Sequence, residues 1–315
     1  LSHVDHALFN NVNFIENHIT AEQEGTSING GAISTHNMSS DFTDNIYQIV
    51  FMNSLFEDNH LHSTANNIYA SGGAVVVSQN IHAVFNNTIF RSNYINATGA
   101  NSASEAAAVK FSNYTPTSWD SYPKSVFEGC LFEENYVQDS GNQSATLLIS
   151  TAVKTLIRNS LIINNSSQAA QSLFRADPGY DNNGNGADFR FQNNTIYGNN
   201  SQEFMHAWGF GAKIEFVNNI IWQNNTQNNS SNNIAYAEQE GATITMNNNI
   251  MVSKFIQDGR LGFSHSDNID QSPKFRNAGN KDFRLQANSP GIDKGQLNNN
   301  LVYDYRGYYR VGIPD

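Results

Sequence analysis

A seven-residue motif recurs along the chain and constrains the fold more than any other feature of the sequence. It consists of Asn, two residues, a large apolar residue, two residues and Asn. The first copies are NVNFIEN (11–17), NSLFEDN (53–59) and NTIFRSN (87–93). The later copies are GCLFEEN (129–135), NSLIINN (159–165), NTIYGNN (194–200), NIIWQNN (219–225) and a degraded NIMVSKF (249–255). Closing Asn residues thus lie 25–42 residues apart, and repeats of this length indicate a solenoid of stacked units.

A second apolar element keeps a fixed distance from this motif. The segments GGAIS (30–34), GGAVV (72–76) and AAAVK (106–110) each begin 13 residues after the preceding closing Asn. Looser copies follow at ATLLIS (145–150), SLFRA (172–176), FMHAW (204–208) and NIAYA (233–237). Short runs rich in Val, Ile and Phe, bounded by Asn, Gly and Ser, are typical of β-strands.

Each repeat is too small to bury its apolar side alone, and stacking repeats about 4.8 Å apart buries a continuous column. The sequence therefore predicts an all-β fold, a right-handed parallel β-helix of about eight or more rungs. Residues 1–262 form the repeats, and the more highly charged residues 263–315 form a C-terminal cap that covers the open end. The predicted core column consists of Phe14, Phe56, Phe90, Phe132, Ile162, Tyr197, Trp222 and Met251.

The abundance of Asn has a structural explanation within such a stack. The chain contains 48 Asn among 315 residues. Asn tolerates the left-handed backbone of tight corners, and stacked amides can hydrogen-bond from one rung to the next as a ladder. Most Asn residues therefore support the fold and carry little information about function.

Composition excludes several classes of protein. A net charge of −11 with only 17 Lys and Arg residues argues against nucleic-acid binding. The single cysteine, Cys130, excludes a disulfide scaffold and a cysteine-based zinc site, and we expect it to be a buried thiol. No apolar run is long enough to cross a membrane as a helix. Because Leu1 lies almost directly before the first repeat, we expect further parts of the same precursor at one or both ends.

Two family resemblances follow from the repeats and the C-terminal segment. GGAI (30–33) and GGAV (72–75), each followed by a Phe-x-x-Asn element, resemble the repeats of chlamydial polymorphic outer-membrane proteins. Residues 272–275 (SPKF), 282–285 (DFRL) and 289–293 (SPGID) resemble the C-terminal, choice-of-anchor type region of secreted bacterial right-handed β-helix proteins. Gly295, Asp304, Gly307 and Arg310 fit this second pattern too. The resemblances imply a bacterial protein that is secreted or displayed on the cell surface, and they imply no particular reaction.

Outward positions of the second repeat element supply the candidate functional residues. Lys110, Arg175 and His206 are the catalytic candidates, because a polysaccharide lyase needs a cation beside the uronate carboxylate and a base for the adjacent proton. Arg175 and Asp177, together with Trp208 and Tyr236, are the candidates for glycan binding, because aromatic faces stack on sugar rings. If the strands stack, these residues fall along one face.

Three functions remain open at this point. The signatures of polygalacturonases and pectate lyases are missing, which favours a binding or adhesion module that recognises a polysaccharide or surface glycan. The first alternative is a polysaccharide lyase-like enzyme that acts on an acidic polysaccharide. The second alternative is a structural stalk that holds other domains away from the cell.

One segment resembles the start of a calcium-binding loop. Asp181, Asn183 and Asn185 match D-x-N-x-N-G, and Asp188 can supply a further negative charge. No other cofactor is expected, and calcium is expected only here. His60 and His62 share a metal-like spacing but lack a third ligand, and we expect them in an exposed loop.

Overall fold

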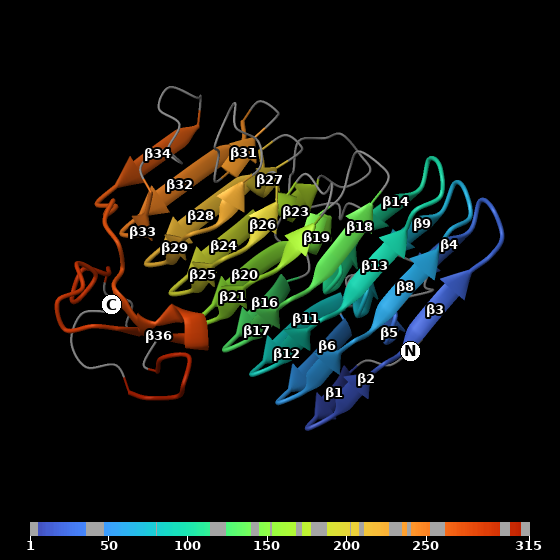
Figure 1. Ribbon diagram of the computed structural model, residues 1–315, viewed down its shortest axis with the longest axis horizontal. Helices are drawn as coiled ribbons and strands as arrows, with labels where there is room; N and C mark the ends of the chain where they lie inside the picture. The colour runs from blue at the N-terminus through green and yellow to red at the C-terminus, as the bar shows by residue number, and fades with distance from the viewer. Residues whose placement is uncertain are drawn as a thin grey trace.

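The computed structural model describes residues 6–35, 47–79, 81–113, 124–139, 145–151, 153–167, 172–177, 188–201, 203–207, 211–226, 235–237, 241–252, 262–296 and 303–309. These residues form a right-handed parallel β-helix, as predicted. Equivalent strands of successive rungs pair side by side in parallel sheets, from the blue first rung to the orange last one (Figure 1). No helix in this part of the chain has the length and apolar character needed to cross a membrane.

Sheet B carries the centre of the seven-residue motif, and the strands of sheet A lie directly before the motif in each rung. Within the described residues, sheet A contains β1 (His6–Asn10), β6 (Tyr47–Met52), β11 (Ile81–Asn86), β16 (Lys124–Glu128), β20 (Lys154–Arg158), β24 (Asp188–Gln192), β28 (Lys213–Val217), β32 (Thr243–Asn247) and β34 (Phe263–Ser266). Sheet B contains β2 (Asn13–Ile15), β7 (Leu55–Glu57), β12 (Ile89–Arg91), β17 (Leu131–Glu133), β21 (Leu161–Ile163), β25 (Thr195–Tyr197), β29 (Ile220–Trp222) and β33 (Ile250–Met251).

Three further sheets complete the rungs. Sheet C contains β3 (His18–Ala21), β8 (His60–Ser63), β13 (Tyr94–Ala97), β18 (Tyr136–Asp139), β22 (Ser166–Ser167), β26 (Asn200–Ser201) and β30 (Asn225–Thr226). Sheet D contains β4 (Ser27–Asn29), β9 (Tyr69–Ser71) and β14 (Ala103–Glu105). Sheet E, the second repeat element, contains β5 (Ile33–Thr35), β10 (Val75–Ser78), β15 (Val109–Ser112), β19 (Ala145–Thr151), β23 (Ser172–Asp177), β27 (Glu203–Ala207) and β31 (Ala235–Ala237).

The core column of sheet B confirms six predicted members and corrects two. It runs through Phe14, Phe56, Phe90, Phe132, Ile162, Ile196, Ile221 and Met251. The prediction was wrong for Tyr197 and Trp222, which lie on the opposite face of the sheet. The Asn193–Asn194 and Asn199–Asn200 doublets let the motif fit in two registers one residue apart, and a shift of one residue exchanges the faces of a strand.

Stacked phenylalanine rings fill the first rungs of the core. The Phe56 and Phe90 ring centroids lie 5.1 Å apart with the planes 5° from parallel. A second column on sheet A stacks Phe51 on Phe85 at 5.0 Å. Offset stacking of this kind adds to the burial of apolar surface, so each rung is tied to the next through two aromatic contacts.

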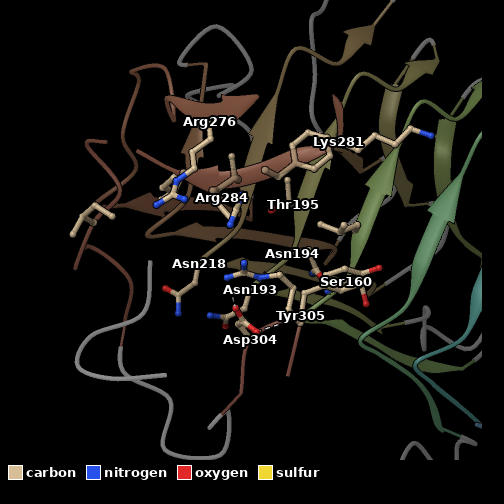
Figure 2. A pocket seen from close by; sticks show the side chains of 16 residues that line it. Ser160, Asn193, Asn194, Thr195, Asn218, Arg276, Lys281, Arg284, Asp304 and Tyr305 are labelled. Carbon is tan, nitrogen blue, oxygen red and sulfur yellow. Dashed lines mark hydrogen bonds and ion pairs between the residues drawn. The ribbon is translucent and has the colours of Figure 1, made fainter. Parts of the chain in front are cut away.

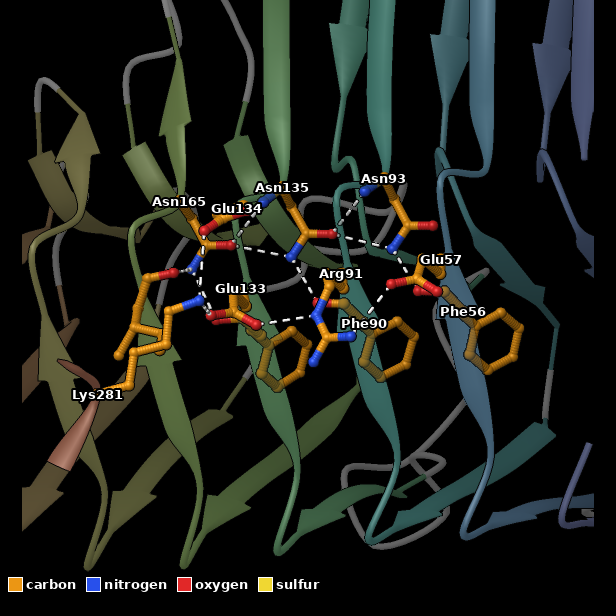
Figure 3. Close-up of polar contacts among 12 residues, drawn as sticks. Phe56, Glu57, Phe90, Arg91, Asn93, Glu133, Glu134, Asn135, Asn165 and Lys281 are labelled. Atoms are coloured by element: carbon orange, nitrogen blue, oxygen red, sulfur yellow. Dashed lines mark hydrogen bonds and ion pairs between the residues drawn. The ribbon is translucent and has the colours of Figure 1, made fainter. Parts of the chain in front are cut away.

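A buried Asn ladder runs beside the sheet B column. Asn135 Oδ1 accepts hydrogen bonds from the backbone nitrogen of Asn93 at 3.1 Å and from its Nδ2 at 3.0 Å (Figure 3). Asn135 Nδ2 in turn donates to Asn165 Oδ1 and to the Phe90 carbonyl, both at 2.9 Å. The amide-to-amide bonds join Asn17, Asn59, Asn93, Asn135, Asn165, Asn199 and Asn224. The closing Asn of the two late repeats are therefore Asn199 and Asn224, one residue before those that the sequence indicated.

The corners between sheets A and B use a different set of Asn residues. Positive φ angles of 49° to 63° occur at Asn11, Asn53, Asn87, Gly129, Asn159, Asn193, Asn218 and Asn248. Asn and Gly adopt this left-handed conformation at low cost. We call these eight residues the corner row. The sequence assigned the corner conformation and the ladder hydrogen bonds to the same Asn residues. In the structure, the corner row and the Asn ladder are two separate rows of residues.

The C-terminal segment returns along one side of the solenoid. Strand β34 still pairs in parallel with β32, and a hairpin of β35 (Phe275–Asn277), the 3₁₀ turn η3 (Ala278–Asn280) and β36 (Asp282–Leu285) then lies beside β21 and β25 (Figure 1). The outward ring of Tyr197 packs against Phe283, with centroids 5.2 Å apart. Lys281 forms an ion pair with Glu133 (Figure 3). The described part of this segment therefore covers the outer face of sheet B from β17 onward.

Candidate functional site

The register of sheet E places the three catalytic candidates in one row, as predicted. Arg175 pairs with His206 on the next strand, and Ile149 lies between Lys110 and Arg175. On β15 the residues on either side of Lys110 belong to the hydrophobic core, and the same holds for Arg175 and His206 on their strands. The three side chains therefore lie on the outer face of the sheet. We call them the sheet E row.

The structure also shows that this row is covered. Exposed fractions are 9% for Lys110, 4% for Arg175 and 9% for His206, whereas an open row would leave such long side chains in solvent. Buried charges require partners, and ion pairs supply them for Lys110 and Arg175.

Lys110 is held by groups that sheet D brings next to it. It forms an ion pair with Glu105, and its Nζ donates to Tyr69 Oη at 2.8 Å and to Ser71 Oγ at 3.3 Å. Nζ also lies 4.5 Å from the centroid of the Tyr69 ring, within the range of a cation–π interaction. Tyr69, which also donates to Glu105, is 39% exposed. Lys110 thus positions a more exposed aromatic residue.

Arg175 positions a carboxylate in the same way. Its Nε donates to Asp177 Oδ1 at 2.6 Å. Burial raises the pKa of Asp177, and the negative charge of Glu105 raises it further, while Arg175 and His206 act in the opposite direction. Charged groups from β23, β27 and sheet D therefore all act on the Asp177 carboxylate. Such an arrangement is a charged cluster rather than a set of isolated surface ion pairs.

Two predicted glycan-binding residues are only partly accounted for. Trp208 lies outside the described residues. The backbone of Tyr236 pairs with that of His206, which extends the sheet E row by one strand as predicted, but its side chain lies outside the described part of the structure.

The proposed calcium loop stays a prediction. Asp181, Asn183 and Asn185 lie outside the described residues. Asp188 is the first residue of β24, where it pairs in register with Lys154 and Lys213. Among the described residues, no group of three or more His, Cys, Asp or Glu side chains is placed to hold a metal ion.

Asp188 carries a testable pH dependence. Burial raises its pKa to about 6, although Lys213 and Lys154 favour the charged form. A raised pKa means that the ionised carboxylate destabilises the folded state, and this cost disappears as the pH falls from above about 6 to below about 4. We expect Asp188→Asn to melt at a higher temperature than the wild type near pH 7 and at a similar temperature near about pH 4. A variant that melts lower near neutral pH would show that the carboxylate has a partner.

Sequence reasoning missed a row of rings on the outer face of sheet C. His18 stacks on His60 at 5.0 Å, and His60 stacks on Tyr94 at 4.4 Å. Each ring residue directly follows a ladder Asn, a signal that was available in the sequence. His60 and His62 lie in strand β8, so their expected placement in a loop was wrong. Because the rings stack on one another, their faces are occupied and their edges point outward, which suits a structural ladder better than a platform for sugars.

Cys130 is a core thiol, as expected. It is fully buried and donates to the Phe85 carbonyl at 3.3 Å. Burial raises its pKa to about 12. Because a cysteine nucleophile acts as the thiolate, Cys130 contributes to packing rather than to chemistry.

Comparison of the chain with models of protein families, with curated proteins and with solved structures gives no match in any of the three. The fold class is that of a parallel β solenoid with Asn ladders. The resemblances to chlamydial repeats and to choice-of-anchor proteins gain no support from these comparisons.

Proposed function

We propose that this chain is a binding module of a secreted or surface-displayed bacterial protein and that it recognises a polysaccharide along the outer face of sheet E. The observation that carries the proposal is the row of Lys110, Arg175 and His206, brought into register along sheet E. The cellular location rests on the resemblance of the C-terminal segment to secreted β-helix proteins.

The contacts distinguish two kinds of residue in the site: buried residues that hold others in position, and exposed residues that can touch a glycan. Lys110 and Arg175 are buried in ion pairs, whereas Tyr69 is 39% exposed and the Asp177 side chain is 18% exposed. A glycan therefore meets the Tyr69 ring and the Asp177 carboxylate first. Aromatic rings and carboxylates suit sugars, because one offers an apolar face and the other accepts hydrogen bonds from hydroxyls. Buried cations hold both groups in place, which lowers the entropy lost on binding.

A chain of sugars can follow the solenoid axis across successive strands. Parallel strands lie about 4.8 Å apart, so Arg175 and His206 on neighbouring strands are spaced by a distance comparable with a sugar unit, whereas Ile149 separates Lys110 from Arg175. The sheet E row and its ion-pair partners Glu105 and Asp177 together offer both signs of charge, which suits hydroxyl groups as well as uronates. The aromatic rings of sheet C present only their edges, so sheet E is the better site.

We expect Tyr69→Ala to weaken retention by the recognised polysaccharide at least about tenfold, as for a central aromatic contact. Retardation of the protein in native gels that contain acidic or neutral polysaccharides measures this. Tyr94→Ala is the matched control, because it removes a stacked ring from sheet C and should leave retention unchanged. Equal retention of the wild type and Tyr69→Ala would place the site elsewhere, and a wild type that no polysaccharide retains would favour the stalk.

A polysaccharide lyase is the second candidate, favoured by one observation. Asp177 combines a raised pKa with Arg175 at 2.6 Å and the charge of His206 nearby. An acid–base group beside a cation is what removal of the proton next to a uronate requires. The same polysaccharides, incubated with the protein and read by the ultraviolet absorbance of unsaturated chain ends, separate the two functions. Absorbance that grows with the wild type and not with Asp177→Asn would replace the binding proposal.

A further inference from the structure

A cavity of about 400 Å³ lies between the C-terminal segment and the outer face of sheet B, on a different sheet from the sheet E row. Its lining includes one acidic residue, Asp304, and four cationic residues, Arg276, Lys281, Arg284 and Arg306. The chain as a whole has a net charge of −11. A locally cationic hollow in an acidic protein attracts anions.

Two arginines reach into this cavity from the hairpin. Figure 2 shows the Arg276 and Arg284 side chains extending from β35 and β36 toward Asn193 and Asn218. Arg284 is paired with Asp282. Arg276 has neither a hydrogen bond nor an ion pair with any of the described residues, although it lies close enough to Asp282 to lower the pKa of that carboxyl. Its guanidinium therefore remains available for a carboxylate, which it can bind through two parallel hydrogen bonds.

The corner row has different hydrogen bonding at one position beside this cavity. In the rungs beneath the C-terminal segment, three corner residues donate to backbone carbonyls of that segment. Asn159 donates to Tyr303 at 3.3 Å, Asn218 to Gln296 at 2.8 Å and Asn248 to Lys294 at 3.4 Å.

Asn193, which lies between Asn159 and Asn218 in the row, is the exception. Its Nδ2 and Oδ1 are both shielded from solvent, and neither has a hydrogen-bond partner among the described residues. Leaving buried polar atoms unpaired costs about 1–3 kcal/mol each. Asn193 also lines the cavity, so a molecule that enters there and displaces the groups shielding the amide can supply the hydrogen-bond partners.

We propose that this cavity binds a small hydroxylated carboxylate, of which a sugar acid is the simplest example. Arg276 holds the carboxylate, the Asn193 amide bonds to a hydroxyl group, and Phe283 and Leu285 pack against the apolar face of the molecule. The volume lies within the range of about 300–1,000 Å³ that small-molecule sites occupy. An inorganic anion is far smaller than the cavity and leaves the amide unpaired.

Calorimetric titration of the full chain with sodium galacturonate tests this proposal, with galactose and inorganic phosphate as the comparison probes. We expect a dissociation constant of about 1 mM for galacturonate and at least about tenfold weaker binding of the other two. Arg276→Gln should weaken galacturonate binding about tenfold or more. Lys124→Gln, which removes an exposed cation from sheet A, should leave the binding unchanged.

Asn193→Gly is the sharper variant. Glycine adopts the φ of 56° found at this position, so the substitution removes the unpaired amide without straining the backbone. Galacturonate binding should weaken, whereas the melting temperature of the free protein should not fall. Absence of galacturonate binding to the wild type, unchanged affinity in Asn193→Gly, or equal affinity for galactose or phosphate would overturn the proposal. Tyr69→Ala changes the proposed polysaccharide site beside sheet E and should bind galacturonate normally. A negative result at one site therefore does not count against the other.

Discussion

Replacing Asn135 with alanine is expected to lower the free energy of unfolding by about 3–5 kcal/mol. The residue is fully buried and lies in the middle of the ladder. Its loss removes the acceptor of the Asn93 backbone nitrogen and the donors to Phe90 and Asn165. Each buried group left unpaired costs about 1–3 kcal/mol, and solvent cannot replace the lost partners. Urea denaturation followed by circular dichroism measures the change.

The control for this variant is Asn53→Gly in the corner row. Asn53 has a φ of 49° and an exposed side chain, so glycine fits the backbone and removes only a weak contact. We expect a change of about 0.5 kcal/mol or less. A loss for Asn135→Ala no larger than that of the control would mean that the ladder contributes little to stability.

The second large effect is expected at the buried pair of Lys110 and Glu105. Glu105 is only 8% exposed, and Lys110→Met removes its counter-ion. Removal of one partner of a buried pair costs about 3–5 kcal/mol. The double variant Glu105→Gln, Lys110→Met removes both charges and keeps a group that accepts from Tyr69. It should recover most of the loss, because a neutral pair of similar volume is often as stable as the ion pair.

A double-mutant cycle built on these substitutions measures the coupling. Strong coupling, with the double variant more stable than Lys110→Met, supports the assignment of Lys110 and Glu105 as one buried ion pair. Additive losses in the two single variants would instead show that Lys110 and Glu105 act independently, and the division into positioning and contact groups would fail.

The sequence predicted the stack because strand length, apolar pattern and repeat spacing are local properties. Its errors have a common physical origin. Where Asn residues are doubled, as at Asn193–Asn194, the motif alone fits two registers, and only the pairing of the whole rung selects one of them. In the selected register Tyr197 points outward, where its ring packs against Phe283, a residue 86 positions further along the chain.

The candidate site was predicted in part for the same reason. Counting along equivalent strands is enough to align Lys110, Arg175 and His206. The burial of Lys110, and its partners Glu105 and Tyr69, depend on the path of the chain around the bend at Ala106, whose φ is 59°. The cavity beside Asn193 depends on how the C-terminal segment returns along the solenoid, and no local pattern encodes that path.

The most direct test of the proposed function is to map where a retained polysaccharide contacts the protein. Amide chemical shifts of the deuterated chain, measured with and without an oligosaccharide from the retained polymer, locate the contact. The account predicts changes at Tyr69, Asp177 and the neighbouring residues of β9, β15 and β23, with β8 and β13 of sheet C unchanged. Changes confined to sheet C or to the side covered by the C-terminal segment would contradict it.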